Sequence, residues 1–460
     1  MDEAVAEPAE TRPVVLMVEH GLGGGVAKHV EDLAALMRPR ADCFLLAPNR
    51  GGLLRLSKFE SGSWPALYFR SPYELDGLAN FLRTAAIGRV HFHHTLRLDS
   101  EILKLPEKLD VPYDYTVHDY YCFCPQITLT TDSFRYCGEP DESGCNKCLQ
   151  IRPAPGNESI EHWRSRHRTF VEGADRVFAP SLSVEQRMRR HFPNASIISA
   201  PHPEPVEAKN PPGPVWRHQA GHLRIVVLGA LNAIKGADLL EACAIDAAKR
   251  NLPLEFHLVG YAYRNLSGAG HRLVVHGKYR DDDVHRLLAD LSAHVAWFPA
   301  RWPETYSYTL SAVLREELPV AATDLGAIHD RLAGRALSWA LSWDSSAQDW
   351  NDFFLKLRSG PHSSETQLIP PTGDQSKPFS YSKDYLLEQS IYIPSSDTKA
   401  DFDAYRSPLR SSPNVLAQYV KGYARQWLST AYRFPGIRRV AVSVFPEHRL
   451  QLLRRWLDKF

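Results

Sequence analysis

The stretch WPETYSYTLSAVLREELPVAATDLG, from Trp302 to Gly326, says most about the fold of this chain. An apolar strand ending at Pro299 precedes this stretch. The stretch itself contains the Pro303–Glu304 turn, then a helix, then a second apolar strand at Val320–Thr323. In open α/β sheets, ligands bind outside the carboxyl ends of the strands. A carboxylate at the mouth of such a strand-to-helix turn therefore predicts that Glu304 lies in a binding pocket.

Short apolar strands alternate with helical segments on both sides of that stretch, which is typical of βαβ units and a mostly parallel sheet. A Pro-rich segment, Pro201–Pro214, interrupts the alternation, since proline continues neither a helix nor a central strand. We therefore predict an α/β protein with two doubly wound domains joined by a hinge. The expected strands are Val14–Glu19, Cys43–Pro48, Arg89–His94, Tyr113–Asp119, Asp175–Ser181 and Ser196–Pro201, then Arg224–Leu231, Leu254–Gly260, Arg272–Gly277 and His294–Ala300.

The same pattern sets the expected domain limits. We expect a disordered tail at 1–12, a first domain at 13–205 and a second domain at 206–340. A Ser-, Pro- and Gly-rich loop and linker region follows at 341–400, and a basic, aromatic helical tail occupies 401–460. A cysteine-rich insertion at 120–150 interrupts the first domain.

Composition narrows the classes of partner. The 23% of charged residues is ordinary for a globular protein, and the formal net charge of +1 argues against a whole surface built for nucleic acid. We find neither a secretory signal nor an apolar run long enough to span a bilayer, and expect a cytoplasmic protein. The basic tail can lie on the inner face of an anionic membrane, cover an apolar face or carry a partner, and these alternatives remain open.

Three further motifs are candidates for binding or chemistry. GLGGG at Gly21–Gly25 lacks the G-x-G-x-x-G spacing, and is either a structural turn or a loop approaching a ligand. Lys235-Gly236 precede a helix and suit a diphosphate, although a solvated lysine with a capping glycine is the alternative. His118 ends a strand in TVHDYYCFCP, where a lone histidine is more often structural; Asp119, His93 and His94 belong to the same sheet edge.

These motifs together resemble those of retaining glycosyltransferases of the GT-B fold, in family four. The resemblance runs roughly from Val14 to Leu332 and is strongest in the second domain. It implies transfer of a sugar from a nucleotide-sugar donor to a glycan or lipid-linked acceptor, with retention of configuration, in surface polysaccharide synthesis. It implies no catalytic metal.

The resemblance also assigns roles to residues. It implies catalytic roles for His118, Glu304 and Lys235. The donor-binding set is Gly24, Gly25, Gly229, Lys235, Gly236, Gly260, Glu304, Thr305, Tyr306 and Ser307.

Two positions depart from the family pattern. The second glutamate of the family motif, which holds the ribose, would stand at Ala312, and a common phosphate-binding arginine would stand at Ala230. Altered nucleoside recognition, such as a dTDP-sugar donor, is one interpretation. A catalytically impaired GT-B module that binds glycan or scaffolds an assembly is the alternative. An epimerase is less favoured, because no residues are arranged for its acid–base chemistry.

Cysteines are concentrated in one segment. Cys43 and Cys243 stand alone, whereas the other five fall between Cys122 and Cys148. We predict that Cys124, Cys137, Cys145 and Cys148 hold a structural zinc ion, leaving Cys122 outside the set. Free thiols or a disulfide pair are the alternative. Some bacterial members of the family resembled carry a similar insertion with a Cys-Pro pair at Cys124-Pro125.

Overall fold

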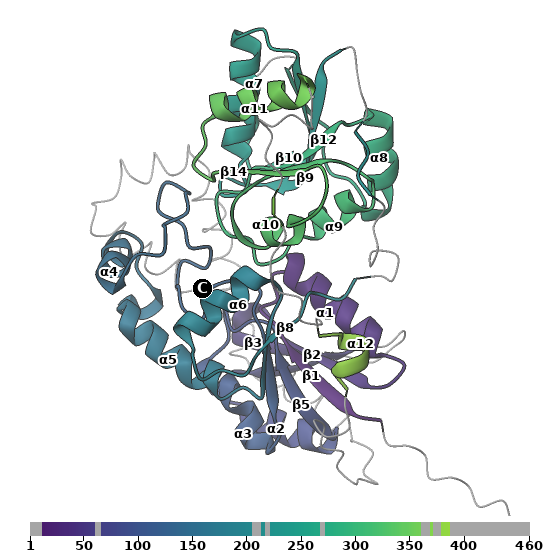
Figure 1. Ribbon diagram of the computed structural model, residues 1–460. Helices are drawn as coiled ribbons and strands as arrows, with labels where there is room; N and C mark the ends of the chain where they lie inside the picture. The colour runs from purple at the N-terminus through teal and green to yellow at the C-terminus, as the bar shows by residue number, and fades with distance from the viewer. Residues whose placement is uncertain are drawn as a thin grey trace, which may run out of the picture. The chain divides into compact units, whose positions relative to one another are not determined.

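A computed structural model describes residues 12–59, 66–204, 213–216, 221–266, 272–359, 369–370 and 379–386. The elements are shown in Figure 1. The chain divides into two compact units, one formed by residues 1–116, 174–176 and 381–460 and the other by 117–173 and 177–380. The expected tail at 1–12, all but its last residue, and the expected basic tail at 401–460 lie outside the described residues.

The first sheet has eight strands in the order β4-β3-β2-β1-β5-β6-β7-β8. Strand β1 pairs parallel with β2 and β5, and β5 pairs parallel with β6, whereas β3 pairs antiparallel with β2 and β4. The strands are β1 Val14–Val18, β2 Asp42–Pro48, β3 Leu53–Lys58, β4 Leu67–Arg70, β5 Ile87–Phe92, β6 Tyr113–Thr116, β7 Arg176–Ala179 and β8 Ile197–Ser199. The helices are α1 Gly24–Met37, α2 Leu75–Thr84, α3 Leu105–Leu109, α4 Glu142–Ile151, α5 Ile160–Glu172 and α6 Leu182–His191.

The second sheet is parallel throughout, in the order β11-β10-β9-β12-β13-β14. Helices cover both of its faces, with α7 and α11 on one side and α8 and α9 on the other (Figure 1). Its strands are β9 Leu223–Leu231, β10 Leu254–Ala262, β11 Leu273–Val275, β12 Val295–Phe298, β13 Val320–Thr323 and β14 Ser338–Leu341. Its helices are α7 Ala237–Lys249, α8 Val284–Leu291, α9 Tyr308–Leu314, α10 Gly326–Leu332 and α11 Ala347–Ser359. The predicted α/β class with doubly wound sheets is confirmed.

Several parts of the fold differ from expectation, and β14 was not among the expected strands. The hairpin β3–β4 was missed because β3 carries Arg55 and Lys58 beside its leucines, as expected of an antiparallel edge region with one open face. The region 341–400 is not only loop and linker. It contains α11, whose Trp350 and Phe354 are buried against Trp297 of β12.

A short C-terminal segment belongs to the first unit. Helix α12, Tyr381–Asp384, is followed by Tyr385, whose hydroxyl lies 2.8 Å from Nδ1 of His91. Beneath it, the buried carboxylate of Asp114 accepts from Arg89 at 2.7 Å and is chelated by Arg176 at 2.9 and 2.7 Å. This paired network satisfies charges that would be costly to bury alone. Within the described residues, no helix combines the length and apolar character needed to cross a bilayer.

Candidate functional site

Glycines line the carboxyl edge of the second sheet. Gly229 of β9 and Gly260 of β10 are register partners with φ of 116° and 142°. A Cβ on Gly260 would stand 1.9 Å from the carbonyl oxygen of Gly229, and one on Gly229 would stand 3.1 Å from Thr309. Both strands therefore require glycine where they end, and two of the predicted donor-binding residues lie side by side.

The loop carrying Lys235 is shaped by its own hydrogen bonds. The Asn232 side chain accepts from the Lys235 amide at 3.0 Å, and the amide of Arg301 donates to Ile234 at 2.7 Å. Gly236 caps α7 in a left-handed conformation, where a Cβ would stand 2.3 Å from the carbonyl oxygen of Pro299. The Ala237 amide donates to the Asn232 carbonyl at 3.2 Å, and no side chain caps the first turn of α7, so the amides of Asp238 and Leu239 are the ones that can bind an anion. Sequence reasoning missed the role of Asn232.

Glu304 is fixed at the mouth of the next loop. It is 5% exposed, and its Oε1 lies 3.3 Å from Nζ of Lys235. The absence of a side chain at Gly326 leaves room for the Glu304 backbone, because a Cβ on residue 326 would stand only 2.7 Å from the Glu304 nitrogen. The Ala327 amide donates to the Glu304 carbonyl at 2.7 Å. Glu304 stands ahead of the α9 N-cap, Ser307, so it is not an acid of the helix's first turn.

The next three predicted residues use their side chains for structural contacts. Thr305 donates to the carbonyl of His118 at 2.6 Å, and Ser307 caps α9 by accepting from Leu310 at 3.3 Å. The Tyr306 hydroxyl donates to Glu204. Only the Tyr308–Leu314 segment is helical, so the amides of Thr305 and Tyr306 precede the helix.

A carboxylate that the sequence did not single out lies beneath this turn. Glu204 accepts from Tyr306 and from Ser311, and its Oε1 lies 3.3 Å from the Arg331 guanidinium. Arg331 also donates to the Ser307 carbonyl at 2.8 Å and lies over the Tyr306 ring at 4.5 Å. The turn is therefore held by two charged residues from outside the quoted motif. Only their three-dimensional placement reveals them.

His118 lies beside the Glu304 turn in the same unit. Besides the bond from Thr305, the neighbouring Tyr120 hydroxyl donates to Pro303 at 2.8 Å. The His118 ring is 5.1 Å from that of buried His202. Burial, with His118 and Arg331 nearby, holds the pKa of His202 well below its usual range. His202 is therefore a neutral neighbour, and sequence reasoning did not predict it.

The two departures from the family pattern are visible in the structure. Ala312 packs against the apolar cluster that contains Leu310 and Val313, whereas Ala230 is exposed at the end of β9. Neither position offers a polar group. An exposed aromatic lies beside Ala230: Tyr261 pairs in register with it, and Nζ of Lys278 lies 5.4 Å from the centroid of the Tyr261 ring.

The glycine turn belongs to the first unit. Gly24 and Gly25 are exposed at the start of α1, and a Cβ on Gly24 would meet nothing within 4 Å. The constrained residue is Gly21, where a Cβ would stand 2.6 Å from the Pro48 carbonyl. The donor-facing role of Gly24 and Gly25 stays a prediction. His93 and His94 are both buried, and the His94 ring lies 4.7 Å from that of His20.

The described chain is similar in fold to known glycosyltransferases. Sucrose-phosphate synthase from Thermosynechococcus elongatus superposes with a TM-score of 0.50 at 14% identity, over 76% of this chain and 90% of that one. HepE from Anabaena in complex with UDP and glucose has a TM-score of 0.48 at 13% identity, over 77% and 91%. The lipopolysaccharide outer core galactosyltransferase WaaB has a TM-score of 0.49 at 12% sequence identity, over 76% of this chain and 91% of that one. A search of curated protein sequences found no match.

The fold is therefore that of GT-B proteins, with two Rossmann-like domains. Residues 23–201, which are under half of the chain, match the sequence model of Glycosyltransferase Family 4.

Proposed function

We propose that this protein is a retaining glycosyltransferase that moves a sugar from a nucleotide-sugar donor to a glycan or lipid-linked acceptor. The observation that carries the proposal is the Lys235–Glu304 ion pair at the glycine-lined edge of the second sheet. The family match of residues 23–201 supports the same class. The proposed setting is surface polysaccharide synthesis in the cytoplasm, at the inner face of the membrane.

Lys235 is the proposed phosphate ligand. Its side chain is 40% exposed, so Nζ can reach a ligand while remaining close to the carboxylate. The first-turn amides of α7 follow directly after it. A cation and helix-start amides stabilise negative charge where it develops on a departing nucleoside diphosphate. This electrostatic role requires no catalytic metal.

Glu304 is the proposed ligand of the donor sugar. Its backbone is fixed by Gly326 and Ala327, so a sugar hydroxyl can donate to a carboxylate that is already oriented. In the proposed reaction the acceptor hydroxyl attacks on the face from which the diphosphate leaves, and the donor phosphate takes its proton. His118, tied to the same turn through Thr305, positions the sugar.

The nucleoside is proposed to lie near Tyr261. Its exposed ring beside Gly260 offers a surface on which a base can stack, and Lys278 adds positive charge. Ala312 faces apolar neighbours and offers no carboxylate to the ribose. A dTDP-sugar lacks the ribose 2′-hydroxyl and loses least from this absence, which makes it the donor to test first.

The experiment measures release of nucleoside diphosphate from UDP-, GDP-, ADP- and dTDP-sugars by the full-length protein. We expect one donor to be hydrolysed slowly without acceptor and turned over faster with a glycan or lipid-linked acceptor. Activity should be lost in Lys235→Ala and in Glu304→Ala. Anomeric configuration of the product, read by NMR coupling constants, tests retention separately.

A non-catalytic glycan-binding or scaffolding module is the second candidate. The absence of polar groups at both Ala230 and Ala312 favours it. Glycan binding with no diphosphate release from any donor, in a folded protein, would support this candidate over the enzyme.

A further inference from the structure

The cysteine-rich insertion contains a segment with little regular structure to hold it. Among the described residues, 120–140 form neither a helix nor a strand, apart from an isolated bridge between Thr130 and Tyr136. Four of its non-glycine residues have left-handed φ values between 52° and 69°: Ile127, Leu129, Phe134 and Glu139. Such conformations cost roughly 1 kcal/mol or more each, so the surroundings must fix them.

Two cysteines of this segment begin matching turns. The backbone N–H of Gln126 donates to the Cys124 thiol, and that of Glu139 donates to the Cys137 thiol. In each turn the donor is two residues beyond the cysteine, with Pro125 or Gly138 between them. Amide hydrogen bonds to sulfur orient the side chain, as outer contacts of metal ligands do.

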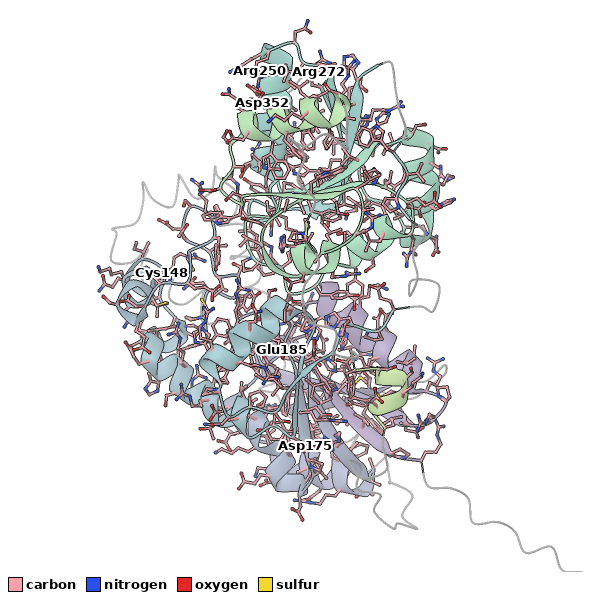
Figure 2. All side chains as sticks on the ribbon, in the orientation of Figure 1. Cys148, Asp175, Glu185, Arg250, Arg272 and Asp352 are labelled. Atoms are coloured by element: carbon pink, nitrogen blue, oxygen red, sulfur yellow. The ribbon has the colours of Figure 1, made fainter. Side chains whose placement is uncertain are left out.

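The other two cysteines lie on α4, where Figure 2 marks Cys148. Cys145 and Cys148 are three residues apart, so both side chains lie on one helix face. Asp141 caps this helix by accepting from the Gly144 amide at 2.8 Å. The Arg164 guanidinium of α5 donates to the Cys145 sulfur at 3.6 Å, which supplies positive charge beside that thiol.

The two turns and the helix bring the four thiols into one neighbourhood. Arg164, which contacts the Cys145 sulfur, also donates to the carbonyl of Phe123, next to Cys124, at 3.2 Å, and the Cys145 thiol donates to the carbonyl of Pro140, close after Cys137, at 3.6 Å. None of the four cysteines is in a disulfide. No three of their sulfurs lie within 4.8 Å of one another, so a tetrahedral site requires these side chains to move closer together.

We propose that Cys124, Cys137, Cys145 and Cys148 bind one structural zinc ion. Four thiolates make a closed tetrahedral site with no position left for a substrate or water. Binding exchanges four thiol protons, which pass to solvent, for the metal. Arg164 partly offsets the net negative charge of a four-thiolate zinc centre.

The zinc would fix the loop that lies between its two turns. Arg135 and Tyr136, near the end of that loop, contact the Trp343 ring at 5.8 and 5.5 Å, respectively. Glu139 ties the loop to α6 by accepting from Arg187 at 2.7 Å. The metal is therefore inferred to stabilise this loop, not to take part in chemistry.

Elemental analysis of the full-length protein, purified under reducing conditions, tests the site. We expect one zinc per chain, and strongly reduced zinc in Cys145→Ser and Cys148→Ser. Cys122→Ser is the matched control, because Cys122 lies in the same segment but contacts the Met188 sulfur at 3.7 Å. It should keep its zinc. A folded wild-type protein with far less than one zinc, or with iron in its place, overturns the proposal.

Two measurements on the wild-type chain avoid reliance on variants that fail to fold. Replacing zinc by cobalt should give the thiolate charge-transfer and intense visible bands of a tetrahedral four-sulfur site. Titration with a thiol reagent should show four cysteines that become reactive only after a chelator is added. Thiols that react fully without chelator, or a mass showing disulfides in freshly reduced protein, would contradict the zinc site. None of these readouts depends on transferase activity.

Discussion

Lys235 and Glu304 form an ion pair, with Nζ 3.3 Å from Oε1, although they come from two different loops of the second sheet. The Glu304 side chain is 7% exposed and that of Lys235 is 40% exposed. The carboxylate is thus held within the fold while the cation remains open to solvent. This difference in exposure suits a site in which a donor phosphate binds the Lys235 ammonium and a sugar hydroxyl donates a hydrogen bond to the Glu304 carboxylate.

Replacing Lys235 by alanine should lower kcat, because it removes a positive charge that stabilises the departing diphosphate. Removing one group that stabilises transition-state charge lowers kcat by roughly 10²- to 10³-fold. Steady-state kinetics with the identified donor provide the measurement. Lys249→Ala, an exposed lysine at the other end of α7, is the control and should be unaffected. Equal kinetics in the two variants would remove Lys235 from the mechanism.

The Glu304→Gln variant separates sugar binding from phosphate binding. It keeps the side-chain shape, removes the charge and releases Lys235 from its partner. Transfer should fall by roughly 10- to 100-fold, as for loss of a hydrogen bond to a charged group of about 1.5–3 kcal/mol. The affinity for the nucleoside diphosphate alone, measured by calorimetry, should stay the same or rise. If the transfer rate and the affinity for the nucleoside diphosphate fell together, Glu304 would have a structural role and would not bind the sugar.

Gly260→Ala should destabilise the second domain. The new Cβ would meet the Gly229 carbonyl at 1.9 Å in a backbone conformation with φ of 142°. Strain and overpacking together predict a loss of roughly 2–5 kcal/mol in the free energy of unfolding. In Gly77→Ala, within α2, nothing lies within 4 Å of the added Cβ, and a gain of up to about 1 kcal/mol is expected. Denaturant unfolding of both variants provides the comparison.

Asp114→Ala should destabilise the first unit, because it leaves the buried Arg89 and Arg176 without their shared carboxylate. Breaking a buried pair in this way costs about 3–5 kcal/mol. The exposed pair of Arg250 and Asp352, which Figure 2 labels at the α7–α11 contact, provides the contrast. Asp352→Ala should shift the urea midpoint little, since exposed ion pairs contribute little. Similar shifts in both variants would contradict this account.

Lowering the pH should reduce the free energy of unfolding because His167 is buried in its neutral form. Burial lowers its pKa from 6.5 to about 4, although the ring also bonds the Trp163 carbonyl at 2.9 Å. The unfolded chain therefore binds more protons between pH 6.5 and about 4, and the free energy of unfolding falls across that window as pH falls. The slope for one group is at most about 1.4 kcal/mol per pH unit. Urea midpoints against pH should flatten in His167→Gln but not in His162→Gln, an exposed residue of the same helix.

The sequence predicted the parallel strands well because buried strands appear as continuous apolar runs. The strand expected at Val320–Thr323 has the observed bounds of β13. Partly polar strands near a sheet edge, such as β3, give no such run, and α11 follows a region in which the alternation had already weakened.

For the site, Lys235, Glu304, Gly229 and Gly260 were found because strand ends and glycines mark sheet-edge loops. Gly326, which closed the quoted stretch, proved to be the residue that gives the Glu304 backbone its room. Glu204 and Arg331 could not be predicted, since their role depends on contacts between segments far apart in the sequence. Neither could His202, whose neutrality follows from burial.

Calorimetric titration of the full-length protein with UDP, GDP, ADP and dTDP tests the central claim, a nucleotide-sugar site at Lys235, most directly. The account predicts saturable binding of one nucleoside diphosphate, at least tenfold weaker in Lys235→Ala, a loss of about 1.4 kcal/mol or more. Absence of binding by all four, or equal affinity in the wild type and in Lys235→Ala, would contradict it.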